Sequence, residues 1–230
     1  MRYSLIIILF IGVLSFSCSK ENENVEDPPN LAYSYAGLNL GSYIIYDVDS
    51  HHYNLPFNID TIIQFQIKEE VNAAFTDLEG DEAFKIIRYQ RDFVQHPWVL
   101  IDVWNAKITA TNYQKVEENL RLIKLVFPVR ENITWNGNVK NVLAPQTYEY
   151  VSAHQAEQIG VIAFDSVATV TQFEDVNLVQ ERLYQEKFAA GVGLVYKKSR
   201  NVNNAFDSSV GLWLPDVGED VTYTVNSYSN

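Results

Sequence analysis

Alternation of apolar and polar residues, repeated in short runs along most of the chain, is the feature that most restricts its fold. Residues 61–69 (TIIQFQIKE) give the clearest example, because Ile63, Phe65 and Ile67 share one face and the residues between them are polar. A period of two is typical of a β-strand with one buried face. The run at residues 42–50 has the same period and predicts a second strand of this kind.

Comparable runs rich in β-branched and aromatic residues follow along the chain, at residues 83–91, 98–111, 121–129, 146–153, 165–173, 193–199 and 221–227. Turn residues separate them, including Gly80 and the pair Asn136-Gly137, which favours a tight turn. One strand with its turn takes roughly ten to fifteen residues, a spacing that favours antiparallel neighbours. The sequence therefore predicts an all-β fold, in which an antiparallel meander forms a curved sheet, an open barrel or a sandwich, with at most one or two short helices.

Two segments are less clear from their sequence. Residues 152–160 (SAHQAEQIG) predict a short helix, because Ser152 would cap its start and Gly160 would end it. Residues 175–191 contain good helix formers and also fit a twisted strand with its polar face outward. We expect a strand in this second segment.

The first residues read as a targeting segment. Arg2 supplies a positive charge before the apolar run at residues 5–14, which is too short to span a membrane as a helix and fits a secretory signal peptide. The small residue Ser17 precedes Cys18, as a cleavage site requires. The segment resembles a bacterial lipoprotein signal, which implies that residues 1–17 are removed and that Cys18 carries the lipid. The alternative is an ordinary signal peptide cut elsewhere, which would leave a free thiol.

The residues that follow Cys18 are polar and acidic and include two prolines. Such a composition cannot bury enough apolar surface to order the chain, so residues 18–32 are expected to form a flexible tether. An acidic stretch directly after the cysteine also resembles the signal that sends Bacteroidota lipoproteins to the outer face of the outer membrane. We therefore expect an exported outer-membrane lipoprotein, displayed at the cell surface, with one all-β domain at residues 33–230.

Charge and cysteine content exclude several classes of protein. The formal net charge of the 230-residue chain is -12 at pH 7. An acidic chain of this kind is a poor ligand for nucleic acid and for anionic lipid surfaces, so the expected contact with a membrane is through the lipid anchor. Cys18 is the single cysteine, which excludes an intramolecular disulfide framework.

A phrase near the C-terminus carries a family resemblance. Residues 186–197 (EKFAAGVGLVYK) resemble a phrase common in uncharacterised Bacteroidota-type exported lipoproteins. Companion phrases occur at residues 41–50, 125–129, 135–138 and 164–166. The resemblance implies a curved antiparallel sheet or an open barrel like the half-barrels of lipoprotein carriers, and it brings no established activity. The residues themselves suggest a steric role for Gly191 and Gly193, which would allow positive φ or a close backbone approach.

The sharpest cluster of metal-ligand residue types lies at the end of the run at residues 42–50. Asp47, Asp49 and His51 would project from one face of a strand, and their oxygen and nitrogen atoms are ligands for zinc or another divalent ion. The end of a strand before a polar loop yields the same residue types without a metal, and we assign no metal site here. Residues 77–82 (DLEGDE) lack the spacing of a calcium loop and predict an acidic hairpin turn.

Motifs for catalysis and for cofactors are not found in the sequence. There is no G-x-S-x-G motif, and His96 and His154 stand alone in sequence. The glycines of GVGL at residues 191–194 precede a predicted strand rather than a helix, unlike those of a dinucleotide site. The sequence therefore names no catalytic residue and predicts no cofactor.

Tryptophans allow a binding hypothesis. Trp98, Trp104, Trp135 and Trp213 would line an apolar cavity or a sugar-stacking surface, or they would simply fill a β-sheet core. Alternation within strands accounts for most aromatic positions without a ligand, so the second interpretation is favoured.

Three functions remain compatible with the sequence. The leading one is a noncatalytic binding or structural lipoprotein of the cell envelope, with a protein, a glycan or an apolar small molecule as its partner. The first alternative is a half-barrel that carries or senses an apolar ligand on its concave face. The second is a metal-assisted hydrolase that uses Asp47, Asp49 and His51.

Overall fold

Nearly every part of the folded chain is extended. The computed structural model describes residues 31–230, so the predicted signal peptide, Cys18 and residues 19–30 of the predicted tether lie outside the described residues. The elements are η1 (Tyr33–Ala36), β1 (Tyr43–Asn54), η2 (Leu55–Phe57), β2 (Ile59–Thr76), β3 (Glu82–Arg91), β4 (Val99–Ile108), β5 (Asn112–Glu117), β6 (Leu120–Val126), β7 (Thr134–Asn136), β8 (Thr147–Ile159), β9 (Ile162–Val176), β10 (Gln180–Ala189), β11 (Gly193–Asp207) and β12 (Leu212–Ser229).

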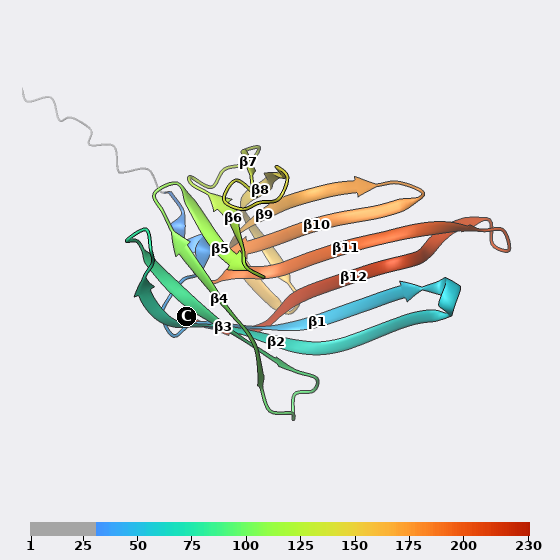
Figure 1. The fold of residues 1–230 in the computed structure, drawn as a ribbon, viewed down its shortest axis with the longest axis horizontal. Coiled ribbons are helices and arrows are strands. Elements are labelled where there is room, and N and C mark those ends of the chain that lie inside the picture. Colours follow the sequence, from blue (N-terminus) through green and yellow to red (C-terminus); the bar gives the residue numbers. More distant parts are fainter. Residues whose placement is uncertain (1–30) are drawn as a thin grey trace, which may run out of the picture.

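These strands form one antiparallel sheet of twelve strands, in which chain neighbours pair and β1 also pairs with β12. The sheet order is β6-β5-β4-β3-β2-β1-β12-β11-β10-β9-β8-β7. The sheet curls into a nearly closed barrel, as Figure 1 shows. The predicted all-β antiparallel fold is therefore confirmed.

The two outer strands of the sheet meet through specific hydrogen bonds. The amide of Ile123 on β6 donates to the Gly137 carbonyl at 2.9 Å, and the indole of Trp135 donates to the Ile123 carbonyl at 2.8 Å. The Tyr150 hydroxyl on β8 donates to the Val126 carbonyl at 2.9 Å and accepts from the Val126 amide at 3.0 Å. These contacts close the barrel where β6 lies beside β7 and β8.

The short helix η1 docks at this closed end, next to the turn between β10 and β11. The Gly191 amide donates to the Ser34 carbonyl at 2.9 Å. Gly37, with φ +62, follows the helix, and a Cβ at this position would lie 2.2 Å from the Val192 carbonyl oxygen. Gly193, with φ +104, packs against the Ala36 carbonyl. The close approach expected of Gly193 is confirmed, and its partner is the helix η1.

The hairpins β1–β2, β9–β10 and β11–β12 continue well beyond the closed end and form an open arm. This arm comprises residues 50–63, 173–184 and 200–220, and in Figure 1 it extends away from η1. The strands β5 and β6 contain 6 and 7 residues, whereas β11 and β12 contain 15 and 18. The shorter strands therefore leave the interior of the arm without an opposite wall.

The main apolar core lies at the closed end. Its most buried members include Tyr35 on η1, Leu125 on β6, Tyr150 on β8 and Phe188 on β10. Ala32, which the sequence assigns to the end of the tether, is also buried in this cluster. A smaller cluster contains Tyr46, Val48 and Ile67, from the face that the alternating pattern predicts.

The helix predicted at residues 152–160 is wrong. This segment belongs to strand β8, which pairs with β9 along its length through three register irregularities. Ala, Gln and Glu favour a helix locally, but pairing with β9 satisfies the backbone and outweighs that preference. The strand expected within residues 175–191 is confirmed as β10. No helix within residues 31–230 is long and apolar enough to cross a membrane.

Candidate functional site

A layer of charged side chains crosses the interior of the barrel. We call it the ion-pair layer, and it consists of Glu69, Arg88, Lys115, Glu117, Lys124, Glu186 and Lys197. Glu69 continues the inward face of β2 that carries Phe65 and Ile67, so the alternation places it inside. The register shift between β5 and β6 leaves Lys124 as an extra residue next to Leu125, and both side chains are buried.

Each carboxylate of the ion-pair layer lies between cations. Glu69 accepts from Arg88 Nε at 3.0 Å and from Lys115 Nζ at 2.8 Å. The Nζ of Lys124 donates to Glu186 at 2.5 Å. Glu117 lies 3.4 Å from the Lys115 Nζ and 3.7 Å from the Lys124 Nζ. Apart from Lys197, these side chains are at most 12% exposed, so the pairing offsets a large cost of desolvation.

The pairing keeps these groups charged. Burial alone would raise the pKa of Glu69, but the charges of Lys115 and Arg88 outweigh it and lower that pKa. Burial likewise opposes the charge of Lys115 and Lys124, yet the neighbouring carboxylates raise the pKa of both ammonium groups. Glu69, Lys115 and Lys124 are therefore fixed charges at neutral pH rather than proton donors and acceptors.

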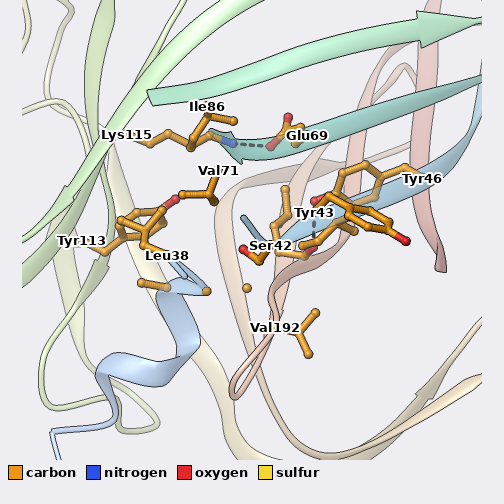
Figure 2. Close-up of a pocket in the computed structure, with 15 residues that line it drawn as sticks. Leu38, Ser42, Tyr43, Tyr46, Glu69, Val71, Ile86, Tyr113, Lys115 and Val192 are labelled. Carbon is orange, nitrogen blue, oxygen red and sulfur yellow. Dashed lines mark hydrogen bonds and ion pairs between the residues drawn. The ribbon is translucent and has the colours of Figure 1, made fainter. Parts of the chain in front are cut away.

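Little space remains between the ion-pair layer and η1. The cavity there has a volume of about 40 Å³ and is drawn in Figure 2, where Lys115 reaches Glu69 on one side of the cavity and Val192 lies on the other. A cavity of this size suits about one water molecule. Burial is the main reason that the pKa of Tyr113 is raised to about 12, so its phenol stays neutral. The closed end is consequently filled, and a larger ligand has no room in it.

A larger pocket lies on the other side of the ion-pair layer, toward the open arm. We call it the interior pocket; its volume is about 510 Å³, and its lining residues are Gln146, Tyr148, Gln172, Phe173, Arg182, Tyr184 and Asn201. Tyr184 precedes Glu186 by two residues on β10, and Asn201 follows Lys197 by four residues on β11. Both therefore share the inward face with the ion-pair layer. Arg182 lies on the same face, two residues before Tyr184 on β10.

The interior pocket contains hydrogen-bond donors that the protein leaves unused. Within residues 31–230, no acidic side chain forms an ion pair with Arg182, and its Nε is buried without a hydrogen-bond partner. The Nε2 of Gln172 is also buried without one. Nearby Asp175 accepts instead from Asn177 and Gln180. Because an unpaired buried donor costs on the order of 1–3 kcal/mol, both groups favour an acceptor that comes from outside the protein.

The structure does not bring the suggested metal ligands together. Asp47, Asp49 and His51 share the outward face of β1, as predicted, but each has its own partner. Asp47 accepts from Gln66 at 2.6 Å and from Asn226, Asp49 accepts from Gln64 at 2.6 Å, and His51 bonds to Asp60. Asp47 and Asp49 also line a surface pocket of about 500 Å³, in which these amides already occupy the carboxylates.

The group within residues 31–230 that has metal-ligand spacing is Asp77, Glu79 and Asp81, in the turn between β2 and β3. Lys107 occupies its centre. The Lys107 Nζ lies 2.7 Å from Asp77, 2.5 Å from Glu79 and 2.8 Å from Asp81. An ammonium group therefore occupies the position of an ion among these carboxylates, and the segment is the acidic hairpin turn that its sequence predicts.

The histidines also lack the arrangement of a catalytic triad. The Nδ1 of His154 lies 3.0 Å from the Tyr35 hydroxyl, and its Nε2 lies 3.0 Å from the Val129 carbonyl. Since a carbonyl accepts, Nε2 carries the proton and Nδ1 accepts from Tyr35. Ser166 bonds to the same Tyr35 hydroxyl at 2.7 Å. These hydrogen bonds connect η1 to β8 and β9, and they leave no unbonded imidazole nitrogen beside Ser166 to act as its base.

The four tryptophans are spread over the molecule, and none lines the interior pocket. Trp104 is buried, with Arg88 stacked 3.7 Å from its ring centre, and Trp135 takes part in closing the barrel. Trp98 stacks with Arg91, and Trp213 is exposed in the open arm. The aromatic residues of the interior pocket are Tyr148, Phe173 and Tyr184. These three residues could have been identified only by knowing which face of each strand points into the barrel.

Large apolar side chains are exposed at the ends of the hairpins in the open arm. They are Leu55, Phe57, Ile59, Ile62 and Ile63 from β1–β2, Val176, Leu178 and Val179 from β9–β10, and Phe206, Val210, Leu212, Trp213 and Leu214 from β11–β12. We call these residues the apolar tips. In Figure 1 the hairpin ends lie at the side of the molecule opposite η1.

The fold and the site define a nearly closed β-barrel with a polar interior pocket at the base of an open arm. No protein-family model matches the chain, and no curated protein sequence matches it. Among solved structures, the chain is similar to a "putative lipoprotein" from Parabacteroides distasonis, with a TM-score of 0.42 and 8% sequence identity. The match covers 85% of this chain and 98% of that chain. Similarity at this level shows neither a common fold nor a common function.

Proposed function

We propose that the protein is an exported, noncatalytic binding lipoprotein of the outer membrane, anchored by Cys18, and that its interior pocket holds a ligand. The observation that carries this proposal is the pocket of about 510 Å³ with unpaired donors on Arg182 and Gln172. Ligand pockets in proteins typically have volumes of roughly 300–1,000 Å³. The acidic residues after Cys18 support display at the cell surface.

The electrostatics of the interior support binding rather than catalysis. General acids and bases work best with a pKa near the pH of the reaction. In the ion-pair layer the pKa of Glu69 is lowered and that of Lys115 is raised, so neither group exchanges protons near neutral pH. Glu186 of this layer lies two residues from Tyr184, which lines the interior pocket, on the same face of β10.

The lining of the interior pocket favours a polar ligand over the apolar ligand of a lipid carrier. An apolar molecule would cover Arg182, Gln172 and Asn201 without offering them an acceptor. Burying polar groups in this way costs free energy for every group left unpaired. A ligand with several oxygen atoms avoids that cost.

Native mass spectrometry of the mature protein, extracted gently from its own membrane, tests ligand binding. Spectra before and after denaturation should differ by the mass of a small molecule that the folded protein retains. A folded protein that carries no molecule, and that binds none of the saccharides tested below, would contradict the proposal. Replacing Cys18 with serine tests the anchor separately, because the variant should leave the membrane fraction while the domain keeps its fold.

A second candidate function is docking of a protein partner at the apolar tips, and their exposure is the observation that favours it. Exposed apolar patches of this kind mark interaction sites on soluble domains. Asp60, Asp207 and Asp216 lie among the apolar tips, and the chain as a whole is acidic. We therefore expect a partner with an apolar surface and basic side chains around it, rather than an anionic membrane.

Aspartate at Phe57, in the open arm, should weaken this association, whereas aspartate at Val142, which is exposed in the loop before β8, should not. The readout is the amount of one identified partner that cross-links to each variant in intact cells. Equal cross-linking of both variants would argue against docking at the apolar tips. Anionic vesicles provide a second test. If the wild type and the Phe57→Asp variant bind such vesicles equally well, this result would also argue against a protein partner at the apolar tips.

A further inference from the structure

We propose that the interior pocket binds a saccharide that carries a carboxylate, such as a uronic acid, with Arg182 as the residue that holds the carboxylate. This inference rests on the proposed function, since it names the class of ligand for the same pocket.

Arg182 supplies the charge. It is the one charged residue among those described that line the interior pocket, and no carboxylate of residues 31–230 pairs with it. Half-buried Arg91 and Arg121 donate to the side chains of Gln66 and Gln114, whereas two other arginines of this acidic chain have carboxylate partners. Arg88 pairs with Glu69, and Arg200 pairs with Glu181 and Asp220. A ligand carboxylate would give Arg182 the partner that these arginines already have.

The number of cations favours a carboxylate over a phosphate. A guanidinium group binds one carboxylate through two parallel hydrogen bonds, which matches both the charge and the shape of that anion. Sites for phosphate groups commonly use clusters of cations or several converging backbone amides. The interior pocket offers Arg182 alone, because Lys124 of the ion-pair layer beneath it is already bonded to Glu186.

The amides of the interior pocket suit hydroxyl groups. Gln146, Gln172 and Asn201 contribute side-chain amides, which both donate and accept hydrogen bonds. A hydroxyl group also does both, so a sugar can satisfy these amides in a way that a fatty acid or an aromatic acid cannot. The Nε2 of Gln172, buried without a partner, would then have an acceptor. Phe173 and Tyr184 add apolar ring surface for the C–H face of a sugar.

The strand register places these groups within the reach of one sugar ring. Arg182 on β10 lies directly opposite Asn201 on β11, and the Cβ atoms of such a pair are roughly 5 Å apart. Tyr184 is two residues further along the same face, which is a distance of about 7 Å. Arg182 can therefore hold the carboxylate while Asn201 contacts an adjacent hydroxyl and Tyr184 contacts the ring.

Isothermal titration of the mature lipidated protein in detergent, with three matched sugars, tests the proposal. The sugars are a disaccharide that ends in a uronic acid, the methyl ester of the same disaccharide, and the corresponding neutral disaccharide. The acid should bind most tightly, because the ester keeps the shape and loses only the charge. We expect the Arg182→Met variant to bind the acid roughly tenfold to a hundredfold more weakly, as the loss of a charged hydrogen bond predicts.

Two further variants separate charge from folding. The Arg182→Lys variant keeps the charge and loses the two parallel hydrogen bonds, so its affinity should fall between those of the wild type and the methionine variant. The Arg130→Met variant removes an exposed arginine that does not line the interior pocket, and it should bind the acid normally. Circular dichroism and melting temperatures of all variants report whether each one folds.

Different outcomes would overturn the two proposals separately. Equal affinity for the acid and its ester, with binding lost in a Tyr184→Ala variant, would overturn the role of the carboxylate and leave a ligand in the interior pocket. A sugar phosphate that binds more tightly than the uronic acid would also overturn the role of the carboxylate and leave a ligand in the interior pocket. Unchanged affinity for the acid in both the Arg182→Met and the Tyr184→Ala variants would overturn binding in this pocket altogether.

Discussion

Replacing Glu69 with glutamine tests whether the ion-pair layer stabilises the barrel. The Glu69 side chain is 12% exposed and accepts hydrogen bonds from Arg88 at 3.0 Å and from Lys115 at 2.8 Å. Glutamine has nearly the same volume, so the change creates almost no cavity. Its main effect is to remove one negative charge from between two buried cations.

The expected loss of unfolding free energy depends on the contacts that Lys115 and Arg88 retain in the variant. Removing one partner of a buried ion pair typically costs about 3–5 kcal/mol of unfolding free energy. Lys115 retains Glu117 at 3.4 Å, and Arg88 retains its stacking on Trp104 at 3.7 Å. Both remaining contacts reduce the penalty, so we expect a loss near the lower end, about 3 kcal/mol.

The matched control is the same substitution at Glu79. Glu79 also bonds to a lysine, Lys107, but its side chain is 59% exposed and Lys107 keeps Asp77 and Asp81. Surface ion pairs contribute little, so the control should lose far less stability. Urea unfolding, followed by tryptophan fluorescence and by circular dichroism, measures both. If the two variants lose the same small amount, the ion-pair layer is not a stabilising element and the reasoning fails.

Three further predictions concern packing, closure and pH. Alanine at Gly137 would place its Cβ 2.4 Å from the Tyr148 ring, so we expect a loss of about 1–3 kcal/mol in urea unfolding and weaker binding in the interior pocket. Phenylalanine at Tyr150 removes the hydroxyl that bonds to both backbone groups of Val126, so stability should fall by about 1–3 kcal/mol, with faster hydrogen exchange of the Val126 amide. Burial alone would raise the pKa of Glu117, but the surrounding lysine charges lower it below its ordinary value of 4.5. Its contribution to stability is therefore complete above pH 4.5 and is lost as the pH falls toward the lower pKa of the folded state, and a pH series of unfolding free energies should be flatter for the Glu117→Gln variant.

The alternating pattern was sufficient to predict the fold class and the inward faces of the first strands. Tyr46 and Val48 are buried on one face of β1, and Ile67 is buried beside them on β2. This part of the fold was predictable because apolar side chains leave water wherever a sheet has one covered face. The second half of strand β8 was not, because its irregular pairing with β9 breaks the period of two and Ala153 to Gln158 read as helix formers.

The candidate site was beyond the reach of the sequence for a different reason. Its lining residues come from the four consecutive strands β8 to β11 and from Gln146 just before β8, and they form no motif. Polar residues such as Arg182 are normally assigned to the outer face of a strand, but Arg182 lines the interior pocket. Lys124 faces inward because of a register irregularity between β5 and β6, which has no recognisable sequence signal.

The location of the interior pocket follows from the unequal lengths of the strands. Where the short strands β5 and β6 face β10 and β11, side chains fill the interior, and every buried charge there needs a partner. Beyond the end of β6, strands β9 to β12 continue without an opposite wall, so water reaches the inward face and polar side chains are tolerated on it. Arg182 stands on β10 just past this boundary, four residues from Glu186. It is close enough to the closed end to be half-buried and far enough from the ion-pair layer to have no carboxylate. A cation in that position is free to bind an anion from solution, and this is why the end of the filled interior is the place to look for the ligand.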